Sequence, residues 1–361
     1  MKDYSAGVVP YVTASHDIWD LDNKSSVLKL DWNEATVPPS PYVIKHIKEL
    51  VSGDFPFQWY PNTDNKVLIK KLADYIGIDE ENVQIFPSSD VIHEYVSRIW
   101  FGRGDKVGIV WPSYDNFRAT VEVSGGQVVY VDMPELKFNL NIVKESIIKN
   151  SLDLLYIANP NNPTGEQIDV EIIEELLAEN PNCMFLIDEA YSEFSRVSSS
   201  KLVSNYENII ITRTFSKAFG LASFRVGYLI SSPNNVKKIS KIRNSKNVST
   251  LAQEAVTSAL DDIKYMENYV DEIRRARSYL IDEMNKWSYV KKVYNNTESN
   301  FLLLEFENES IRNDISLFLK SKQIYVRCLG QTEYLKKCIR VTIGTVEQME
   351  KFVNIIKRYG V

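Results

Sequence analysis

A lysine among hydroxyl-bearing residues is the first candidate for chemistry. Residues 212–225 read TRTFSKAFGLASFR and follow an apolar run, with Lys217 inside the segment. The side chains of Thr214, Ser216 and Arg225 are all able to bind a phosphate group. A lysine in a loop is more often merely exposed to solvent, but these neighbours favour a phosphate-bearing ligand next to Lys217.

An acid at the end of an apolar run is the second candidate. Residues 184–191 read MFLIDEAY, so Asp188 follows a buried-looking run and Tyr191 comes soon after it. Because an unpaired buried carboxylate is costly, Asp188 needs a partner. A helix N-cap or a structural ion pair would satisfy it, and so would the protonated ring nitrogen of a ligand at the carboxyl end of a strand.

Two polar turns follow other apolar runs. Residues 159–165, NPNNPTG, carry side-chain amides, among them Asn162, that are able to bind a ring hydroxyl. A simple turn rich in Pro and Gly is the alternative. In residues 87–90, PSSD, Ser89 or Asp90 is able to cap a helix, while the N–H groups of the same first turn suit a phosphate. Both interpretations stay open for each turn.

Short β-branched runs that alternate with longer helical patterns must position these segments. The runs expected as strands are residues 83–85, 107–110, 128–131, 154–157, 184–187, 209–212 and 226–230. This alternation predicts an α/β domain with a largely parallel sheet covered by helices. The nearly continuous apolar runs are expected of strands that are buried on both faces.

The pattern changes after about residue 232. Long helices are expected over residues 249–260 and 265–286, followed by separated strands at residues 301–305, 324–327 and 338–342. These elements predict a second, smaller α+β domain. We expect three parts in all: an N-terminal arm over residues 1–35, a large domain over 36–235 and a small domain over 236–361.

Length and composition exclude several classes of protein. The chain has 361 residues, 44% of them hydrophobic, and a formal net charge of -6, which argues against nucleic acid as the main partner. No apolar run reaches the roughly 18 residues that a membrane span needs. A signal segment is not recognisable, so a cytoplasmic location is expected. No metal site is expected, because none of the following residues has metal-binding spacing: His16, His46, His93, Cys183, Cys328 and Cys338.

Together these segments resemble the fold-type I aminotransferases. The Asn-Pro-x-Asn-Pro-Thr-Gly turn, the Asp-x-x-Tyr strand end and a Ser-Lys pair followed by an arginine occur here in the order typical of that family. Further segments extend the resemblance over nearly the whole chain and bring it closest to the histidinol-phosphate aminotransferase subgroup: Asn33-Glu34, Tyr60-Pro61, residues 299–301 (SNF) and residues 340–345 (RVTIGT). The resemblance implies an aspartate-aminotransferase-like α/β large domain with a mainly parallel sheet, a smaller α+β domain, and pyridoxal 5'-phosphate (PLP) as cofactor.

The resemblance also implies roles for individual residues. Lys217 would hold the cofactor as a Schiff base and then move a proton during the reaction. Asp188 would keep the pyridine nitrogen protonated. Asn162 and Tyr191 would bind the 3'-oxygen of the ring, and Tyr114 would stack on its face.

The cofactor's phosphate and a second subunit are implied as well. Five residues resemble the family's phosphate-binding set: Ser89, Asp90, Thr214, Ser216 and Arg225. Tyr60 resembles the residue that reaches the cofactor of the neighbouring subunit, so a homodimer is expected. On the substrate side, Arg340 resembles the carboxylate-binding arginine, Arg327 an arginine that binds the substrate phosphate, and Asn33 a further substrate-binding residue.

Departures from the subgroup concentrate where the substrate should bind. Ser245 and Lys246 stand where Pro-Tyr is usual, and residues 35–37 read ATV where Asn-Pro-x-Gly is common. We therefore expect transamination of a small phosphorylated amino alcohol or amino acid, with glutamate as amino donor. Histidinol phosphate is one candidate, and the pair of serinol phosphate and dihydroxyacetone phosphate is a smaller one. The alternatives are a PLP-dependent decarboxylase of a phosphorylated amino acid and a catalytically inactive PLP-binding sensor.

Overall fold

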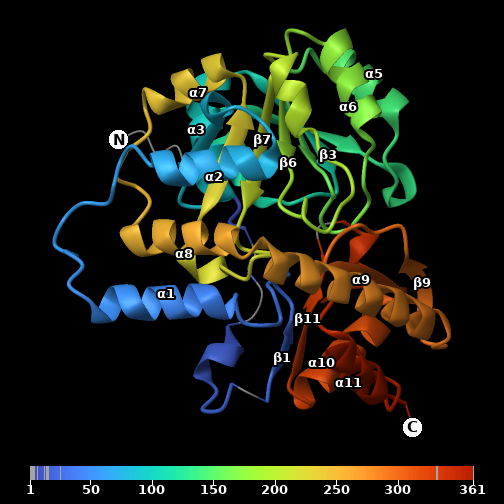
Figure 1. Ribbon diagram of the computed structural model, residues 1–361. Helices are drawn as coiled ribbons and strands as arrows, with labels where there is room; N and C mark the ends of the chain where they lie inside the picture. Colours follow the sequence, from blue (N-terminus) through green and yellow to red (C-terminus); the bar gives the residue numbers. More distant parts are fainter. Residues whose placement is uncertain are drawn as a thin grey trace.

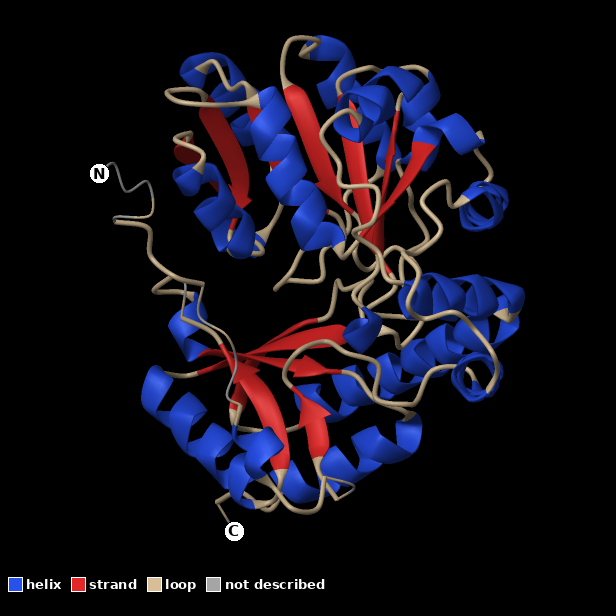
Figure 2. Cartoon of the chain, turned by 90° about the vertical axis from the view of Figure 1, so that its left-hand side faces the viewer, coloured by secondary structure: helices blue, strands red, loops and turns tan. Residues whose placement is uncertain are grey.

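Two sheets of different size organise the computed structural model, which describes residues 5, 7–11, 13, 16–24, 26–330 and 332–360. Figure 2 shows the two sheets at opposite ends of the molecule, with loops between them. The larger sheet has seven strands in the order β2-β8-β7-β6-β5-β3-β4. Their bounds are β2 (Val83–Phe86), β3 (Lys106–Trp111), β4 (Gln127–Asp132), β5 (Leu154–Ala158), β6 (Met184–Asp188), β7 (Ile209–Thr214) and β8 (Gly227–Ser231).

All seven strands coincide with the runs predicted from the sequence, which confirms the predicted α/β domain. The sheet is parallel except for β8, which runs antiparallel to both β7 and β2. The reason is the connection: β7 returns to β8 through a short segment without a crossover helix, and such a connection joins antiparallel strands. That short segment contains Lys217.

Helices cover both faces of the large sheet, as Figure 1 shows. One face packs against α3 (Ser89–Trp100), α4 (Asn116–Val123) and α7 (Pro233–Ser240) in an apolar layer of its own. The other face packs against α2 (Lys66–Ile76), α5 (Leu140–Asn150), α6 (Val170–Glu179) and α8 (Thr250–Asp261). The strands are therefore buried on both sides, which explains their continuous apolar sequences.

The smaller sheet has five strands in the order β1-β11-β12-β10-β9. Their bounds are β1 (Leu28–Leu30), β9 (Val290–Tyr294), β10 (Phe301–Phe306), β11 (Ile324–Cys328) and β12 (Cys338–Thr342). Its helices are α9 (Ile263–Asn285), α10 (Glu309–Ser321) and α11 (Val346–Ile356), while α1 (Pro41–Ser52) lies along α8. The predicted strands at residues 301–305, 324–327 and 338–342 are confirmed.

The first strand, β1, lies within the residues predicted as an N-terminal arm, yet it is part of the small sheet. β1 pairs in parallel with β11, so Leu28 lies opposite Ile324 although the two residues are at opposite ends of the chain. The sequence after β1 is thereby held against the small sheet. The division into residues 1–35, 36–235 and 236–361 stays a prediction. In the described part of the chain, no helix combines the length and apolar character that crossing a membrane requires.

Candidate active site

A cavity of about 550 Å³ lies where the carboxyl ends of β5, β6 and β7 face the small sheet. It is lined by side chains from both sheets and from the N-terminal segment. Every residue that the sequence suggested for the site lines it, with the exception of Tyr60: Asn33, Ser89, Asp90, Tyr114, Asn162, Asp188, Tyr191, Thr214, Ser216, Lys217, Arg225, Arg327 and Arg340. The fold thus brings together residues that are far apart in the sequence, and their individual roles stay predictions.

Lys217 enters the cavity from the segment that joins β7 to β8. Its Nζ donates a hydrogen bond to the backbone oxygen of Trp32 over 3.0 Å. Burial, together with the positive charge of Arg340, lowers the pKa of Lys217 to about 8. A larger share of this amine is therefore neutral near physiological pH than for an exposed lysine, and the neutral form is the nucleophile. Gly220 lies in the same segment and has a φ of +69°, which a residue with a side chain adopts only with strain.

Asp188 ends β6 beneath the cavity. Its Oδ2 accepts a hydrogen bond from the Tyr156 hydroxyl over 2.9 Å, and its Oδ1 accepts from the Thr212 hydroxyl over 3.3 Å. Burial raises the pKa of Asp188, whereas His93 and Tyr156 oppose that rise. The carboxylate is held in one orientation by neighbouring strands and lines the cavity.

His93 is a neighbour of Asp188 that the sequence did not reveal. It is 1% exposed, its Nε2 lies 4.0 Å from Asp188 Oδ2, and neither ring nitrogen has a hydrogen-bond partner. Its ring meets those of Phe117 and Tyr156 edge-on. From the sequence, the histidines were expected to form no metal site, and none of them was expected in the active site. The signal that was overlooked is the spacing: His93 comes four residues after Ser89, on the same face of α3.

A set of hydroxyls, N–H groups and one guanidinium converges at another end of the cavity. Ser89 and Asp90 form the first turn of α3, whose unpaired backbone N–H groups suit an anion. The hydroxyls of Thr214 and Ser216 lie 2.9 Å apart, and Arg225 Nη1 donates to Ser216 Oγ over 3.3 Å. This arrangement is able to surround a phosphate group.

Gly227 allows this close approach of the backbone. A Cβ at this position would lie 2.5 Å from the backbone nitrogen of Ser89. The first residue of β8 must therefore lack a side chain so that α3 can begin beside it. The sequence gives no sign that position 227 requires a glycine, because this requirement follows only from the packing of β8 against α3.

Two tyrosines and an asparagine contribute further polar groups. The hydroxyl of Tyr114 donates to Asp90 Oδ1 over 3.1 Å. The hydroxyl of Tyr191 accepts from Asn33 Nδ2 over 2.9 Å, and burial raises the pKa of Tyr191 to about 12. Asn33 is itself held by the small sheet, because its backbone nitrogen donates to Thr342 Oγ1. Tyr191 therefore remains a neutral hydroxyl that is positioned by both sheets.

Two arginines from adjacent strands face the cavity on the side of the small sheet. Arg327 of β11 and Arg340 of β12 are partners in the strand register. Arg340 donates from Nη1 to Asn162 Oδ1 over 2.7 Å and from Nη2 to the backbone oxygen of Asp31 over 2.7 Å. Burial lowers the pKa of Arg340, and the charge of Arg327 adds to the effect. This end of the cavity therefore favours a ligand that carries negative charge.

The N-terminal segment contributes residues for which the sequence gave no signal. Tyr11, Thr13 and Trp19 line the cavity, and the ring of Tyr11 lies 5.6 Å from that of Tyr114. Arg118 of α4 donates to the backbone oxygen of Val9 over 2.6 Å, which attaches the segment to the large sheet's helices. These residues are scattered in a stretch without periodicity, so their place in the site depends on tertiary contacts alone.

Tyr60 lies apart from the cavity of its own chain. It is 76% exposed, and Lys246 Nζ lies over its ring at 4.1 Å from the centroid. Within one chain, the structure thus leaves Tyr60 free of contact with the other predicted site residues.

The arrangement fits a phosphorylated pyridine aldehyde. Asp188 offers a buried carboxylate for a ring nitrogen, and the first turn of α3 with Arg225 offers donors for a phosphate. Lys217 lines the same cavity and presents an amine whose lowered pKa suits reaction with an aldehyde. These residues would hold PLP by its ring nitrogen, its phosphate and its aldehyde.

Comparisons with known proteins agree with this geometry. The model of the family "Aminotransferase class I and II" matches residues 25–356. The chain is similar to the dihydroxyacetone phosphate transaminase of Campylobacter jejuni, with 42% identity over 98% of this chain and 96% of that protein. It is also similar to the histidinol-phosphate aminotransferase of Clostridium novyi, with 33% identity over 94% of this chain and 93% of that protein.

A solved structure shares the fold. The histidinol-phosphate aminotransferase of Sinorhizobium meliloti in complex with PLP superposes with a TM-score of 0.87 at 24% identity, over 98% of this chain and 95% of that one. The aspartate-aminotransferase-like fold that the sequence predicted is thereby confirmed. The chain belongs to the class I and II aminotransferases, which are PLP-dependent enzymes.

Proposed function

We propose that this chain transfers an amino group between glutamate and a small phosphorylated ketone, with dihydroxyacetone phosphate and its amine, serinol phosphate, as the first candidates. The observation that carries the proposal is the pair Arg327 and Arg340, which lie side by side on β11 and β12 at one end of the cavity. A relative that is 42% identical bears the name dihydroxyacetone phosphate transaminase, which supports the same substrate class.

Lys217 has two tasks in this proposal. As a neutral amine it would hold the cofactor, and its Nζ would also take up and return a proton at the substrate's amino-bearing carbon. A pKa of about 8 suits both tasks, because the group exchanges protons readily near neutral pH. PLP, when bound, supplies a ring that withdraws electrons from that carbon.

Asp188, Asn162 and Tyr191 would set the electronic state of the ring. Asp188, oriented by the Tyr156 hydroxyl, would hold the ring nitrogen. The Tyr191 hydroxyl and the Asn162 amide would bind the ring oxygen, and Tyr114 would stack on the ring. The phosphate of the cofactor would be bound by Ser89, Asp90, Thr214, Ser216 and Arg225.

The two arginines would serve two different substrates in turn. Arg340 is held by Asn162 and Asp31, so its guanidinium is oriented to bind the carboxylate of glutamate. Arg327 takes the phosphate of the ketone. Asn33 lines the same cavity next to Tyr191, and its amide would contact the substrate.

The proposal includes a homodimer. Tyr60 lies away from the cavity of its own chain, in a segment where Phe57, Trp59 and Tyr60 are 46%, 72% and 76% exposed. Such an apolar surface is typical of an interface. Tyr60 would then bind the phosphate of the partner's cofactor. A cytoplasmic location, the absence of nucleic acid and membrane partners and the three-part domain division also stay predictions.

The test is amino exchange by the purified holoenzyme. Glutamate is supplied with dihydroxyacetone phosphate, and 2-oxoglutarate is measured. Unphosphorylated dihydroxyacetone is the control for the phosphate, and histidinol phosphate with 2-oxoglutarate tests the larger candidate. The proposal is wrong if no phosphorylated ketone or amine exchanges an amino group. Release of CO2 from a phosphorylated amino acid would instead establish the decarboxylase alternative.

A further inference from the structure

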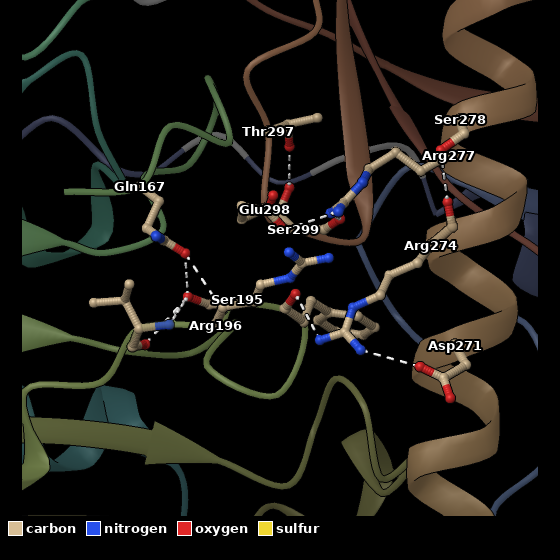
Figure 3. Close-up of polar contacts among 12 residues, drawn as sticks. Gln167, Ser195, Arg196, Asp271, Arg274, Arg277, Ser278, Thr297, Glu298 and Ser299 are labelled. Atoms are coloured by element: carbon tan, nitrogen blue, oxygen red, sulfur yellow. Dashed lines mark hydrogen bonds and ion pairs between the residues drawn. The ribbon is translucent and has the colours of Figure 1, made fainter. Parts of the chain in front are cut away.

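Three arginines gather at a second place in the molecule, beside Glu298, whose backbone nitrogen contacts the end of the NPNNPTG turn. Figure 3 shows the guanidinium group of Arg196 between those of Arg274 and Arg277. Arg196 belongs to the loop after β6, whereas Arg274 and Arg277 are three residues apart on one face of α9. None of the three lines the active-site cavity.

The carboxylates nearby are too few to balance these cations. Asp271 accepts from Arg274 Nη1 over 3.0 Å, and Glu298 accepts from Arg277 Nη2 over 2.8 Å. Arg196 makes no ion pair with any residue that the structure describes. In addition, the Nε of Arg274 is buried without a hydrogen-bond acceptor. Three guanidinium groups thus face two carboxylates.

The excess positive charge acts on Arg277. Burial lowers the pKa of Arg277, and the charges of Arg274 and Arg196 lower it further, although Glu298 opposes them. Arg277 is therefore in a place where an additional negative charge would be favourable. Its side chain is 10% exposed and that of Arg274 is 31% exposed, while Arg196 is open to solvent. An anion is able to enter from solution and would be partly removed from water when bound.

The loop that carries Arg196 is itself held in place. Its neighbour Ser195 donates from its hydroxyl to the side-chain oxygen of Gln167, and the Arg196 backbone nitrogen donates to the same oxygen. On the other side, Arg277 Nη1 donates to the backbone oxygen of Ser299 over 3.0 Å. The donors therefore project from fixed backbone, as Figure 3 shows, and not from a tail or an isolated surface helix.

We propose that Arg196, Arg274 and Arg277 form a second anion site that binds a phosphate group, either free phosphate or the phosphate ester of a small metabolite. Guanidinium groups bind such oxyanions with paired, charge-assisted hydrogen bonds. Three of them that approach from two different elements suit a tetrahedral anion better than a planar carboxylate. The proposal does not depend on which substrate the active site takes.

The position of this site connects the two sheets. Arg196 follows a strand of the large sheet, and α9 packs on the small sheet. The backbone nitrogen of Glu298 also donates to the oxygen of Gly165 over 2.9 Å, at the end of the turn that carries Asn162. A phosphate bound here would join the two parts next to that turn, so we expect it to stabilise the folded holoenzyme.

The test measures phosphate binding directly. Holoenzyme is dialysed to equilibrium with radiolabelled inorganic phosphate at constant ionic strength, for wild type, Arg196→Gln and Arg98→Gln. Arg98 is the matched control, because it is an exposed arginine on α3 with a glutamate four residues before it. We expect wild type and Arg98→Gln to bind phosphate equally. Arg196→Gln should either bind one phosphate fewer per chain or bind that phosphate on the order of tenfold more weakly.

Further variants and ligands separate the outcomes. Arg196→Lys, which keeps the charge, should bind phosphate with intermediate strength, and an unchanged far-ultraviolet spectrum would show that the variants are folded. Glycerol 3-phosphate competing more strongly than free phosphate would identify an ester as the ligand, and the reverse order would identify the free anion. If Arg196→Gln binds as much phosphate as wild type, and as tightly, the proposed site does not exist.

Discussion

Replacing Tyr156 by phenylalanine removes one hydroxyl group from a fully buried place beneath the active site. Tyr156 has an exposed fraction of 0%, and its hydroxyl donates to Asp188 Oδ2 over 2.9 Å. The ring of the new side chain fills the same volume and keeps its stacking on Phe117, whose ring centroid lies 4.8 Å away. The substitution therefore tests one hydrogen bond and leaves the packing in place.

The expected size of the effect follows from the partner's charge. A hydrogen bond to a charged group contributes about 1.5–3 kcal/mol, and one pKa unit corresponds to about 1.4 kcal/mol. Since burial already raises the pKa of Asp188 and Tyr156 opposes that rise, we expect the substitution to remove about 1.5–3 kcal/mol of stabilisation from the ionised carboxylate and to raise its pKa further. Asp188 must be ionised to hold a ring N–H, and a higher pKa means that it takes up a proton at a higher pH.

The assay is the dependence of kcat/KM on pH, with the dissociation constant for PLP as a second measurement. The acid limb of the profile should move to higher pH, and PLP should bind about 10- to 100-fold less tightly. Tyr130→Phe is the control, because Tyr130 is a 42% exposed tyrosine on β4, away from the cavity. An acid limb that stays within a few tenths of a unit of wild type would refute the role given to the Tyr156 hydroxyl.

Three further predictions concern other parts of the site. The rate at which apoprotein Lys217 takes up PLP, followed by absorbance, should rise with pH around a midpoint of about 8, because only the neutral amine reacts and burial lowers its pKa; a midpoint near the ordinary lysine value would contradict this. Arg327→Gln should raise KM for the phosphorylated ketone about 10- to 100-fold while KM for glutamate changes little, and equal losses for both substrates would argue against phosphate recognition by Arg327. Gly227→Ala should weaken PLP binding and lower the melting temperature, since its Cβ would lie 2.5 Å from the Ser89 nitrogen, whereas Gly102→Ala, which has nothing within 4 Å, should change neither.

Much of the fold was accessible from the sequence because its strands are local patterns. The seven runs of the large sheet were recognisable as buried strands, and the bounds of each strand differ from the prediction by only one or two residues. β1 and β9 were not predicted. β1 is three residues long, and its stability comes from pairing with a strand near the other end of the chain, for which the sequence near Leu28 contains no signal.

The residues of the site also fall into two groups, those that a local sequence motif reveals and those that only tertiary packing brings together. Residues that bind through a local motif, such as Lys217 or Asp188, were recognisable because each motif combines a strand end with a characteristic turn. Tyr156 was not, and His93 was marked only by its spacing from Ser89, because both approach Asp188 only after α3 and β5 have packed beside β6. Tyr11 was not recognisable either, because it lines the cavity from a segment that forms no helix or strand and so has no periodic sequence pattern.

The pairing of β1 with β11 also determines when this enzyme becomes competent during its synthesis. A ribosome releases the N-terminal end first, yet Leu28 has no strand to pair with until Ile324 has been made. Asn33, just beyond β1, waits longer still for its contact with Thr342. β1 must therefore remain unpaired until nearly all of the chain has emerged, and a nascent chain that stalls before β12 cannot complete its catalytic cavity.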